Sequence, residues 1–276
     1  MLLIAGATGN VGGELVHVLR RAGEPVRALT RTDRDSSLPP DVERAVGDLN
    51  DPASLTAALN GVRGVFLLSG YADMPGLLTK ICDAGARHVV LLSSGAVDGG
   101  DPANVVVRHH AVAEAAVKGA GLPWTILRPS GFHSNALRWL PQLRAGNVVR
   151  EPFADVPVAG IDPLDIAAVA AAALTTPGHD HAIYRLTGPE ATLPADRIRI
   201  LARLLGRDLH LRPLTDDEAR AELAATMPPE YVDAFVNFFV DGAYDDTVVR
   251  PTVPDLLGRP ARTFRQWAEA HADAFR

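Results

Sequence analysis

The sequence predicts an α/β fold in which a doubly wound parallel sheet is followed by a smaller, mostly helical C-terminal lobe. Short apolar runs alternate with stretches whose apolar residues recur three and four positions apart, such as Val11, Leu15, Val18 and Leu19. Continuous apolar strands that alternate with helices are typical of a parallel sheet covered on both faces. Right-handed crossovers between such strands give the doubly wound arrangement.

Most of the predicted strands lie in the first half of the chain. They are Leu2–Ala5, Val26–Leu29, Val42–Val46, Gly64–Leu68, His88–Leu92 and Trp124–Leu127. After residue 150 the pattern changes to prolines, loops and short strands, and we expect the second, smaller lobe to cover 151–276. The first domain is then 1–150, and the two are not fully separate units.

The second half holds one more strand and several helices. Asp162 can cap an alanine-rich helix that begins at Pro163 and ends near Leu174, because proline suits the first helical turn. His181–Leu186 is expected to be a strand. From Pro194 onward the pattern is mostly helical, with amphipathic stretches at Ile198–Leu205, Tyr231–Val240 and Phe264–Ala270.

Composition excludes several classes of protein. The 276 residues carry a formal net charge of −6, which argues against a nucleic-acid partner. The single cysteine, Cys82, allows neither an intramolecular disulfide nor a cysteine-based metal cluster, and a reducing cytoplasm fits it. The longest apolar run, Ile166 to Leu174, is far shorter than the roughly 20 residues that cross a bilayer, so no membrane is expected. We also find no targeting segment and predict a cytoplasmic protein.

The most informative feature is the glycine triplet Gly6, Gly9 and Gly12, directly behind the first apolar run. At a strand-to-helix turn, small residues let the backbone approach a pyrophosphate, and the helix N-terminus offers free N–H groups. The spacing is G-x-x-G-x-x-G, which differs from the G-x-G-x-x-G of many dehydrogenases. An ordinary turn is the alternative, but the position favours nucleotide binding in a Rossmann-type domain.

The end of the second strand bears on the choice of coenzyme. Dehydrogenases that use NAD often place an acidic residue there for the ribose hydroxyls, whereas this chain has Arg31. An arginine can pair with a 2′-phosphate through two hydrogen bonds, and Arg34 can reinforce it. Both arginines can also be plain surface residues, and Asp33 can serve a ribose instead. We favour NADP(H) over NAD(H).

Three further strand ends carry polar or small residues. Asp48 and Leu49 can flank an adenine, although Asp48 or Asp51 can equally cap the next helix. Ser69 and Ser93 lie where ligands bind in such sheets, beyond the carboxyl ends of the strands, but serine is also a common turn former.

Several segments together resemble the NmrA-like branch of the atypical short-chain dehydrogenase/reductase superfamily. They are GATGNVGGELVHVLRRAGEPVRALTR, VGDLND, HVVLLSSGAV, GLPWTILRPSGFHSN, GIDPLDIAAVAAAAL and YRLTGPE, and they cover residues 1 to about 190. That family includes NAD(P)H-dependent quinone reductases and non-catalytic dinucleotide sensors. The resemblance implies a coenzyme domain at 1–150 and a substrate lobe at 151–276.

The resemblance also implies roles for single residues. The diphosphate loop would consist of Gly6, Thr8, Gly9, Asn10, Val11 and Gly12. Arg31 would meet the 2′-phosphate, and Asp48 with Leu49 would flank adenine. The ribose side would be lined by Leu68, Ser69 and Gly70, and Ser93 and Ser94 would lie near the nicotinamide. The loop between the lobes, where the substrate arrives, would contain Pro129, Ser130, Gly131, Phe132 and Asn135.

One departure from the superfamily concerns its catalytic Tyr-x-x-x-Lys, in which the lysine lowers the pKa of the tyrosine. Alignment on HAVAE places Val106 at the tyrosine position and His110 at the lysine position. Valine donates no proton. His110 can bind the nicotinamide ribose, supply a proton, or be a plain helix histidine. Glu114, four residues later, can orient His110 or be an ordinary solvated side chain.

Other site types fit poorly. The histidines His109, His110 and His133 match no familiar metal-ligand spacing, so we predict no metal site. A serine hydrolase lacks its G-x-S-x-G turn, although Ser94 precedes Gly95. Phe235, Phe238 and Phe239 have helical spacing, for which core packing is the main interpretation and a substrate wall the other.

These observations predict an NADPH-dependent oxidoreductase that transfers hydride to a quinone or a similar conjugated electrophile. Such a small-molecule acceptor needs no dedicated tyrosine, since a proton can come from water or a histidine. We expect Ser94, His110, Phe132 and Asn135 to face the reaction space, with His110 and Ser94 as the catalytic residues. The alternative is a non-catalytic NAD(P)-binding redox sensor that acts on a protein partner. A homodimer fits either hypothesis.

Overall fold

The computed structural model describes residues 1–32 and 38–276, and its largest element is a seven-stranded sheet in which every neighbouring pair is parallel. The strands are β1 (Leu2–Ile4), β2 (Val26–Thr30), β3 (Glu43–Val46), β4 (Gly64–Leu68), β5 (Val89–Leu92), β6 (Trp124–Pro129) and β8 (Ala182–Leu186). Their order is β3-β2-β1-β4-β5-β6-β8. The predicted doubly wound Rossmann-type sheet is confirmed, because the strand order reverses between β1 and β4.

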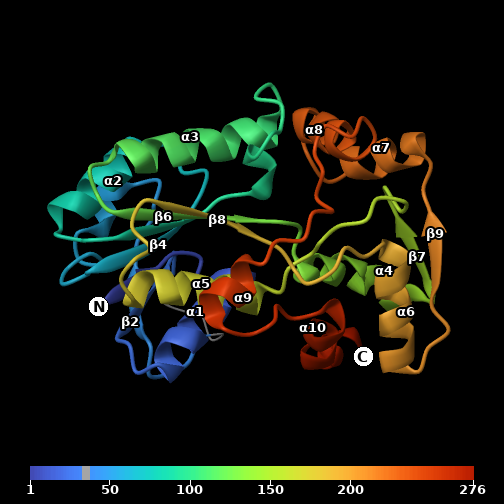
Figure 1. Ribbon diagram of the computed structural model, residues 1–276, viewed down its shortest axis with the longest axis horizontal. Helices are drawn as coiled ribbons and strands as arrows, with labels where there is room; N and C mark the ends of the chain where they lie inside the picture. The colour runs from blue at the N-terminus through green and yellow to red at the C-terminus, as the bar shows by residue number, and fades with distance from the viewer. Residues whose placement is uncertain (33–37) are drawn as a thin grey trace.

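Helices cover both faces of the sheet (Figure 1). On one face lie α1 (Asn10–Arg21), α5 (Pro163–Thr175) and α9 (Thr252–Leu257); on the other lie α2 (Met74–Asp83) and α3 (Val105–Gly119). Side chains alternate along β1: Leu2 and Ile4 belong to the apolar core beneath α1 and α5, and Leu3 to the core on the opposite face. This alternation explains why the strands read as continuous apolar runs.

The second lobe lies beyond the carboxyl ends of the strands (Figure 1). It contains η3 (His133–Trp139), α4 (Leu140–Ala145), β7 (Val148–Glu151), α6 (Pro194–Leu205), β9 (His210–Pro213), α7 (Asp216–Ala224), α8 (Pro229–Phe239), α10 (Phe264–Ala270) and η4 (Ala272–Phe275). Its core is built around the buried rings of Trp139, Phe264 and Trp267. The expectation of a mostly helical C-terminal part misses β9, which pairs in parallel with β7.

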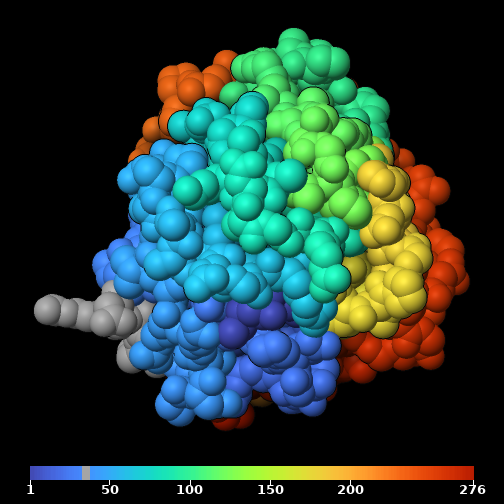
Figure 2. All heavy atoms as spheres, turned by 90° about the vertical axis from the view of Figure 1, so that its left-hand side faces the viewer, coloured from blue at the N-terminus to red at the C-terminus, as the bar shows by residue number. Residues whose placement is uncertain are grey.

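The chain passes between the two lobes more than once. After β7 it returns to the sheet, where α5 packs beside α1 and β8 pairs with β6. As predicted, Asp162 caps α5 by accepting a hydrogen bond from the Leu164 N–H at 2.9 Å. The connecting segments therefore converge on the carboxyl edge of the sheet. The opposite, amino edge forms the face seen in Figure 2, where the second lobe is visible only at the rim.

None of the helices within 1–32 and 38–276 is long and apolar enough to cross a membrane.

Candidate functional site

The glycine triplet forms a tight turn between β1 and α1. Gly6 has a φ of +61°, and its carbonyl accepts a hydrogen bond from the Gly9 N–H at 2.9 Å. A Cβ atom on Gly12 would lie 2.1 Å from that same carbonyl oxygen, so only glycine lets the helix start so close to the loop. Gly9 is the N-cap of α1 and brings no side-chain cap to the helix. The first N–H groups of α1 therefore remain available to a ligand.

A cavity of about 220 Å³ lies at this helix start and joins the two lobes. Its walls include Thr8, Gly9 and Asn10 on the loop, Ser134 on η3 and Trp267 on α10. Val11, in contrast, is buried in the core, so it can offer a ligand only its backbone N–H. The structure thus brings the predicted diphosphate loop against the end of the predicted inter-lobe loop, at Ser134.

The ends of β2 and β3 lie beside each other in the sheet. Arg31 is exposed directly after β2, whereas Asp33 and Arg34 fall outside the described residues. Asp48 is exposed and its carboxylate accepts a hydrogen bond from the Asn50 N–H at 2.9 Å, while Leu49 is buried in the core. The cap of η1 (Pro52–Leu55) is Asp51, which accepts a hydrogen bond from the Ala53 N–H at 3.2 Å.

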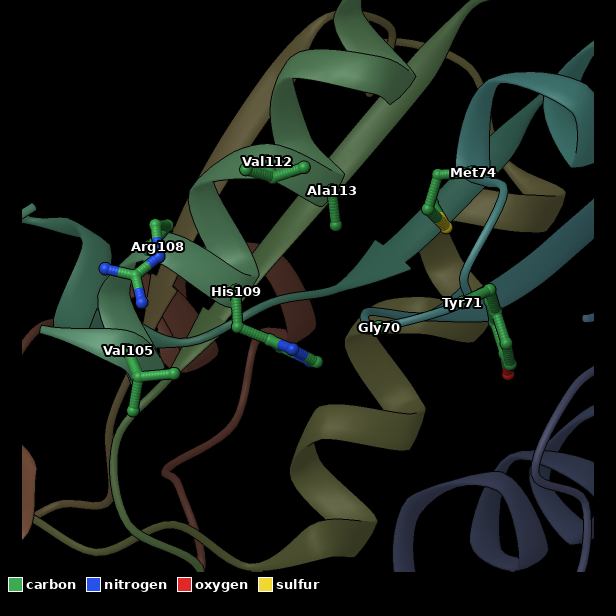
Figure 3. A pocket seen from close by; sticks show the side chains of 8 residues that line it. All are labelled: Gly70, Tyr71, Met74, Val105, Arg108, His109, Val112 and Ala113. Atoms are coloured by element: carbon green, nitrogen blue, oxygen red, sulfur yellow. The ribbon is translucent and has the colours of Figure 1, made fainter. Parts of the chain in front are cut away.

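A second cavity, of about 360 Å³, lies between the loop after β4 and the helix α3 (Figure 3). Gly70, Tyr71 and Met74 form one side, and the α3 residues include Arg108 and His109. The remaining lining residues are Val105, Val112 and Ala113. Burial, and then the nearby charge of Asp48, raise the pKa of Tyr71 to about 12. The Ala72 N–H donates a hydrogen bond to Asn50 Oδ1 at 2.9 Å, so this loop lies beside the loop that follows β3.

Sequence reasoning treated His109 only as a candidate metal ligand and gave Tyr71 no role. The ring of His109 projects from α3 toward Gly70 (Figure 3), and a Cβ on Gly70 would lie 2.2 Å from its Cε1 atom. The signal that could have found His109 is its place next to His110 in the segment aligned with the catalytic motif. Tyr71 could have been found from its place directly after the predicted strand end at Gly70.

His110 is half-buried on α3, and its Nδ1 atom is buried without a hydrogen-bond partner in the part of the chain that the structure describes. Burial, and then the neighbouring His109, lower the pKa of His110 to about 4. The ring is therefore neutral at pH 7 and suits a hydrogen bond to a ligand hydroxyl better than the role of a proton donor.

Glu114 is not the partner of His110, and it is not solvated either, so both sequence interpretations of it are wrong. Its carboxylate is buried and accepts hydrogen bonds from Ser93 Oγ at 2.7 Å, Arg128 Nε at 2.8 Å and Lys118 Nζ at 3.1 Å. Burial raises the pKa of Glu114, but the hydrogen bonds from Arg128 and Ser93 outweigh burial and lower it overall. This ionised group fixes the loop after β5 against α3 and β6.

The three serines at strand ends all have structural partners. Ser93 Oγ donates to Glu114, Ser69 Oγ donates to the Leu92 carbonyl at 3.1 Å, and Ser94 Oγ accepts from the Ala96 N–H at 3.2 Å. Ser94 is thereby the N-cap of η2 (Gly95–Val97). These contacts shape the loops at the carboxyl edge, as the turn-former interpretation expects.

The inter-lobe loop begins at Pro129, the buried last residue of β6. Phe132 is half-buried, forms a bridge with Ile161 and packs against the core of the sheet. Asn135 is exposed on η3, and Leu68 packs over Gly6, where a Cβ would lie 2.9 Å from its Cδ1. The inter-lobe loop thus runs across the carboxyl edge of the sheet to the second lobe.

The aromatic residues of α8 divide into two groups. Phe238 is buried, as the core-packing interpretation predicts. Phe235 and Phe239 are half-buried and stacked, with ring centroids 6.1 Å apart. The ring of Phe153 lies 5.1 Å from that of Phe239, and Phe153 has a φ of +54°, which is costly for an aromatic residue.

The residues at the carboxyl edge fit a dinucleotide. Gly12 leaves no room for a side chain in the turn. Among residues 1–32 and 38–276, no side chain caps the first turn of α1, and no group bonds the buried Nδ1 atom of His110. Together they could hold phosphate and ribose hydroxyls along one edge of the sheet.

Comparisons with known proteins agree with this reading. A family model described as NAD(P)H-binding matches residues 6–177. The chain is 42% identical to the (4-alkanoyl-5-oxo-2,5-dihydrofuran-3-yl)methyl phosphate reductase of Streptomyces griseus, covering 100% of this chain and 99% of that protein. It is 34% identical to the NAD(P)H azoreductase of Xenophilus azovorans, over 100% and 99% of the two chains.

A solved structure supports the fold independently. The crystal structure of an NADPH-dependent quinone oxidoreductase from Escherichia coli in complex with NADPH superposes with a TM-score of 0.80 and 22% identity. The match covers 99% of this chain and 100% of that one.

Proposed function

Since the chain belongs to the NAD(P)H-binding family, we propose that it is an NADPH-dependent reductase that delivers hydride to a conjugated carbonyl acceptor, such as a quinone or an unsaturated lactone. The full-length identity of 42% to the Streptomyces griseus reductase carries this proposal. The substrate in that name is an unsaturated lactone ring bearing an alkanoyl group, in which a C=C bond is conjugated with carbonyl groups. Its chemistry is that of a conjugated electrophile.

The residues for the coenzyme follow from the edge of the sheet. The amides of the Gly6–Gly12 turn would bind the diphosphate, and Arg31 would pair with the 2′-phosphate of NADP(H). Asp48 and Tyr71 would lie near adenine, and the neutral His110 would bind a ribose hydroxyl. When bound, the nicotinamide supplies hydride. These assignments favour NADP(H) over NAD(H) because of the exposed arginine at the end of β2.

The acceptor would enter between the lobes, against the Pro129–Asn135 loop. Val106 cannot donate a proton, and His110 is neutral at pH 7. A conjugated acceptor tolerates this, because hydride transfer leaves a delocalised anion that water can protonate. The protein then contributes mainly orientation and exclusion of solvent.

A steady-state assay tests this proposal. Purified protein is mixed with NADPH and a panel comprising a benzoquinone, an alkanoyl butenolide with and without a phosphate ester, and an azo dye, and NADPH oxidation is followed by absorbance. We expect oxidation above background with at least one conjugated acceptor. Calorimetry with NADPH runs in parallel. Binding without turnover of any acceptor would refute the reductase and favour the redox sensor, for which Val106 at the tyrosine position already argues.

A further inference from the structure

Three polar side chains far apart in the sequence meet at the carboxyl edge of the sheet. Tyr244 and Asp246 lie on the segment 240–251, which connects α8 with α9, and Arg185 lies on β8. Asp246 Oδ1 accepts hydrogen bonds from Arg185 Nη2 at 2.7 Å and from the Tyr244 hydroxyl at 2.8 Å. Arg185 also donates to the Tyr244 hydroxyl, and its guanidinium carbon lies 5.7 Å from the centre of the tyrosine ring.

This cluster touches each of the loops expected around the nicotinamide. The Arg185 guanidinium covers Gly95, where a Cβ would lie 1.8 Å from Nη1, and the same nitrogen donates to the Arg128 carbonyl near the end of β6 at 3.1 Å. Asp246 Oδ2 accepts a hydrogen bond from the Gly131 N–H at 3.0 Å. Tyr244 is therefore held between the loop after β5 and the inter-lobe loop.

The phenol also lies near the position that lacks a tyrosine. Val106, aligned with the catalytic tyrosine of the superfamily, packs against a small apolar cluster formed by Ala96, Val107 and Phe238. Tyr244 packs against the same cluster, from the C-terminal segment rather than from α3. A hydroxyl group is thus available where the helix offers only a valine.

We propose that Tyr244 donates a hydrogen bond to the oxygen of the acceptor on which negative charge develops, in place of the missing helix tyrosine. This inference rests on the proposed reductase function. The acceptor carbon gains a hydrogen and two electrons from NADPH, which becomes NADP⁺, and the negative charge moves to the conjugated oxygen. Water then protonates the anion. A preorganised donor at that oxygen stabilises the charge as it forms.

The hydrogen-bond pattern permits this exchange of partners. If the Tyr244 hydroxyl turns to an acceptor, Asp246 keeps its bonds from Arg185 and from the Gly131 N–H. Arg185 Nη2 still donates to the phenol oxygen and polarises its O–H bond. Burial, and then the charge of Asp246, raise the pKa of Tyr244 above its usual value, so the phenol is protonated at neutral pH and acts as a donor.

Tyr244→Phe tests the inference, with Tyr184→Phe as the matched control. The control also removes a phenol that has one side-chain partner, His179 Nδ1 at 2.8 Å, away from the proposed site. With a benzoquinone or a butenolide we expect kcat to fall about 100-fold in Tyr244→Phe and to stay within about twofold in the control. NADPH affinity and melting temperature should remain close to those of the wild type in both variants.

A second acceptor separates a hydrogen-bond donor from a structural role. A cationic triarylmethane dye accepts hydride at carbon, and no negative charge develops on an oxygen, so Tyr244→Phe should reduce it as fast as the control does. An equal loss with dye and quinone, or no loss with either, would overturn the inference alone. A wild-type protein that binds NADPH but turns over no acceptor would overturn the proposed function together with it.

Discussion

The glycine turn and the Tyr244 cluster lie on the same edge of the sheet but are built in opposite ways. The turn is local: Gly6, Gly9 and Gly12 fall within seven residues, and their backbone atoms create the ligand site. The cluster joins Arg185 with residues 59 and 61 positions away, and Asp246 with Gly131 across 115 positions. The comparison shows that the proposed coenzyme site at the glycine turn depends on backbone geometry. The proposed acceptor site at the Tyr244 cluster depends on tertiary contacts between charged side chains.

The variant with the largest expected effect on stability is Glu114→Gln, which neutralises the buried carboxylate that binds Arg128. In Glu114→Gln, the loss of the negative charge leaves Arg128 with Asp98 as its remaining ion-pair partner, and Asp98 is partly exposed. Because the exposed Asp98 compensates the charge of the buried Arg128 only in part, we expect the free energy of unfolding to fall by about 3 kcal/mol in urea titrations.

The control for this variant is Lys118→Met. Its ammonium group binds the same carboxylate, but its side chain is 39% exposed, so the loss should stay below about 1 kcal/mol. Equal losses in the free energy of unfolding would show that the Glu114–Arg128 contact between α3 and β6 stabilises the protein no more than the exposed Lys118 pair does.

Gly12→Ala tests the glycine turn, the region built from neighbouring residues. The new methyl group would lie 2.1 Å from the Gly6 carbonyl oxygen, so the turn must move and its N–H groups lose their alignment. We expect the NADPH affinity, measured by calorimetry, to fall about 100-fold, which corresponds to about 2.7 kcal/mol. In the control Gly13→Ala the Cβ lies 3.5 Å from the Ala7 carbonyl, an ordinary contact. If Gly12→Ala binds as tightly as this control, backbone approach at the turn is not what NADPH requires.

The contrast also explains what could be predicted from the sequence. Short continuous apolar runs predicted every strand of the main sheet within a few residues, and the glycine spacing predicted the turn after β1. The burial of Glu114 could not be predicted, because a glutamate on a helix is usually solvated and its partner Arg128 lies 14 residues later on another element. Arg185, Tyr244 and Asp246 form no local motif, since only the fold of the second lobe brings them together.

The choice of coenzyme gives a smaller expected effect. Arg31→Glu replaces a cation at the end of β2 by an anion, which would repel the 2′-phosphate of NADPH. We expect the ratio of NADPH to NADH affinity to fall about 30-fold, since one charge-assisted contact is lost and a repulsion is added. Arg87→Glu, which replaces an exposed arginine two residues before the start of β5, makes the same change of charge at the amino edge. An equal change in both variants would point to net charge rather than to a contact at Arg31.

The second lobe provides the smallest effect, through a buried histidine. His133 is 3% exposed; burial, and then the charge of Arg197, lower its pKa to about 4. The folded protein therefore binds fewer protons than the unfolded chain below pH 6.5, so the stabilising contribution of the neutral ring is present above that pH and is lost as the pH falls toward 4. At pH 5.5 the loss should be about 1.4 kcal/mol.

His133→Gln removes this titration, so its stability deficit relative to the wild type should shrink by that amount between pH 7 and pH 5.5 in urea titrations. A deficit of His133→Gln that does not change with pH would mean that the ring titrates in the native protein as it does in water. His133, whose neighbour Ser134 lines the cavity at the glycine turn, would then be open to solvent.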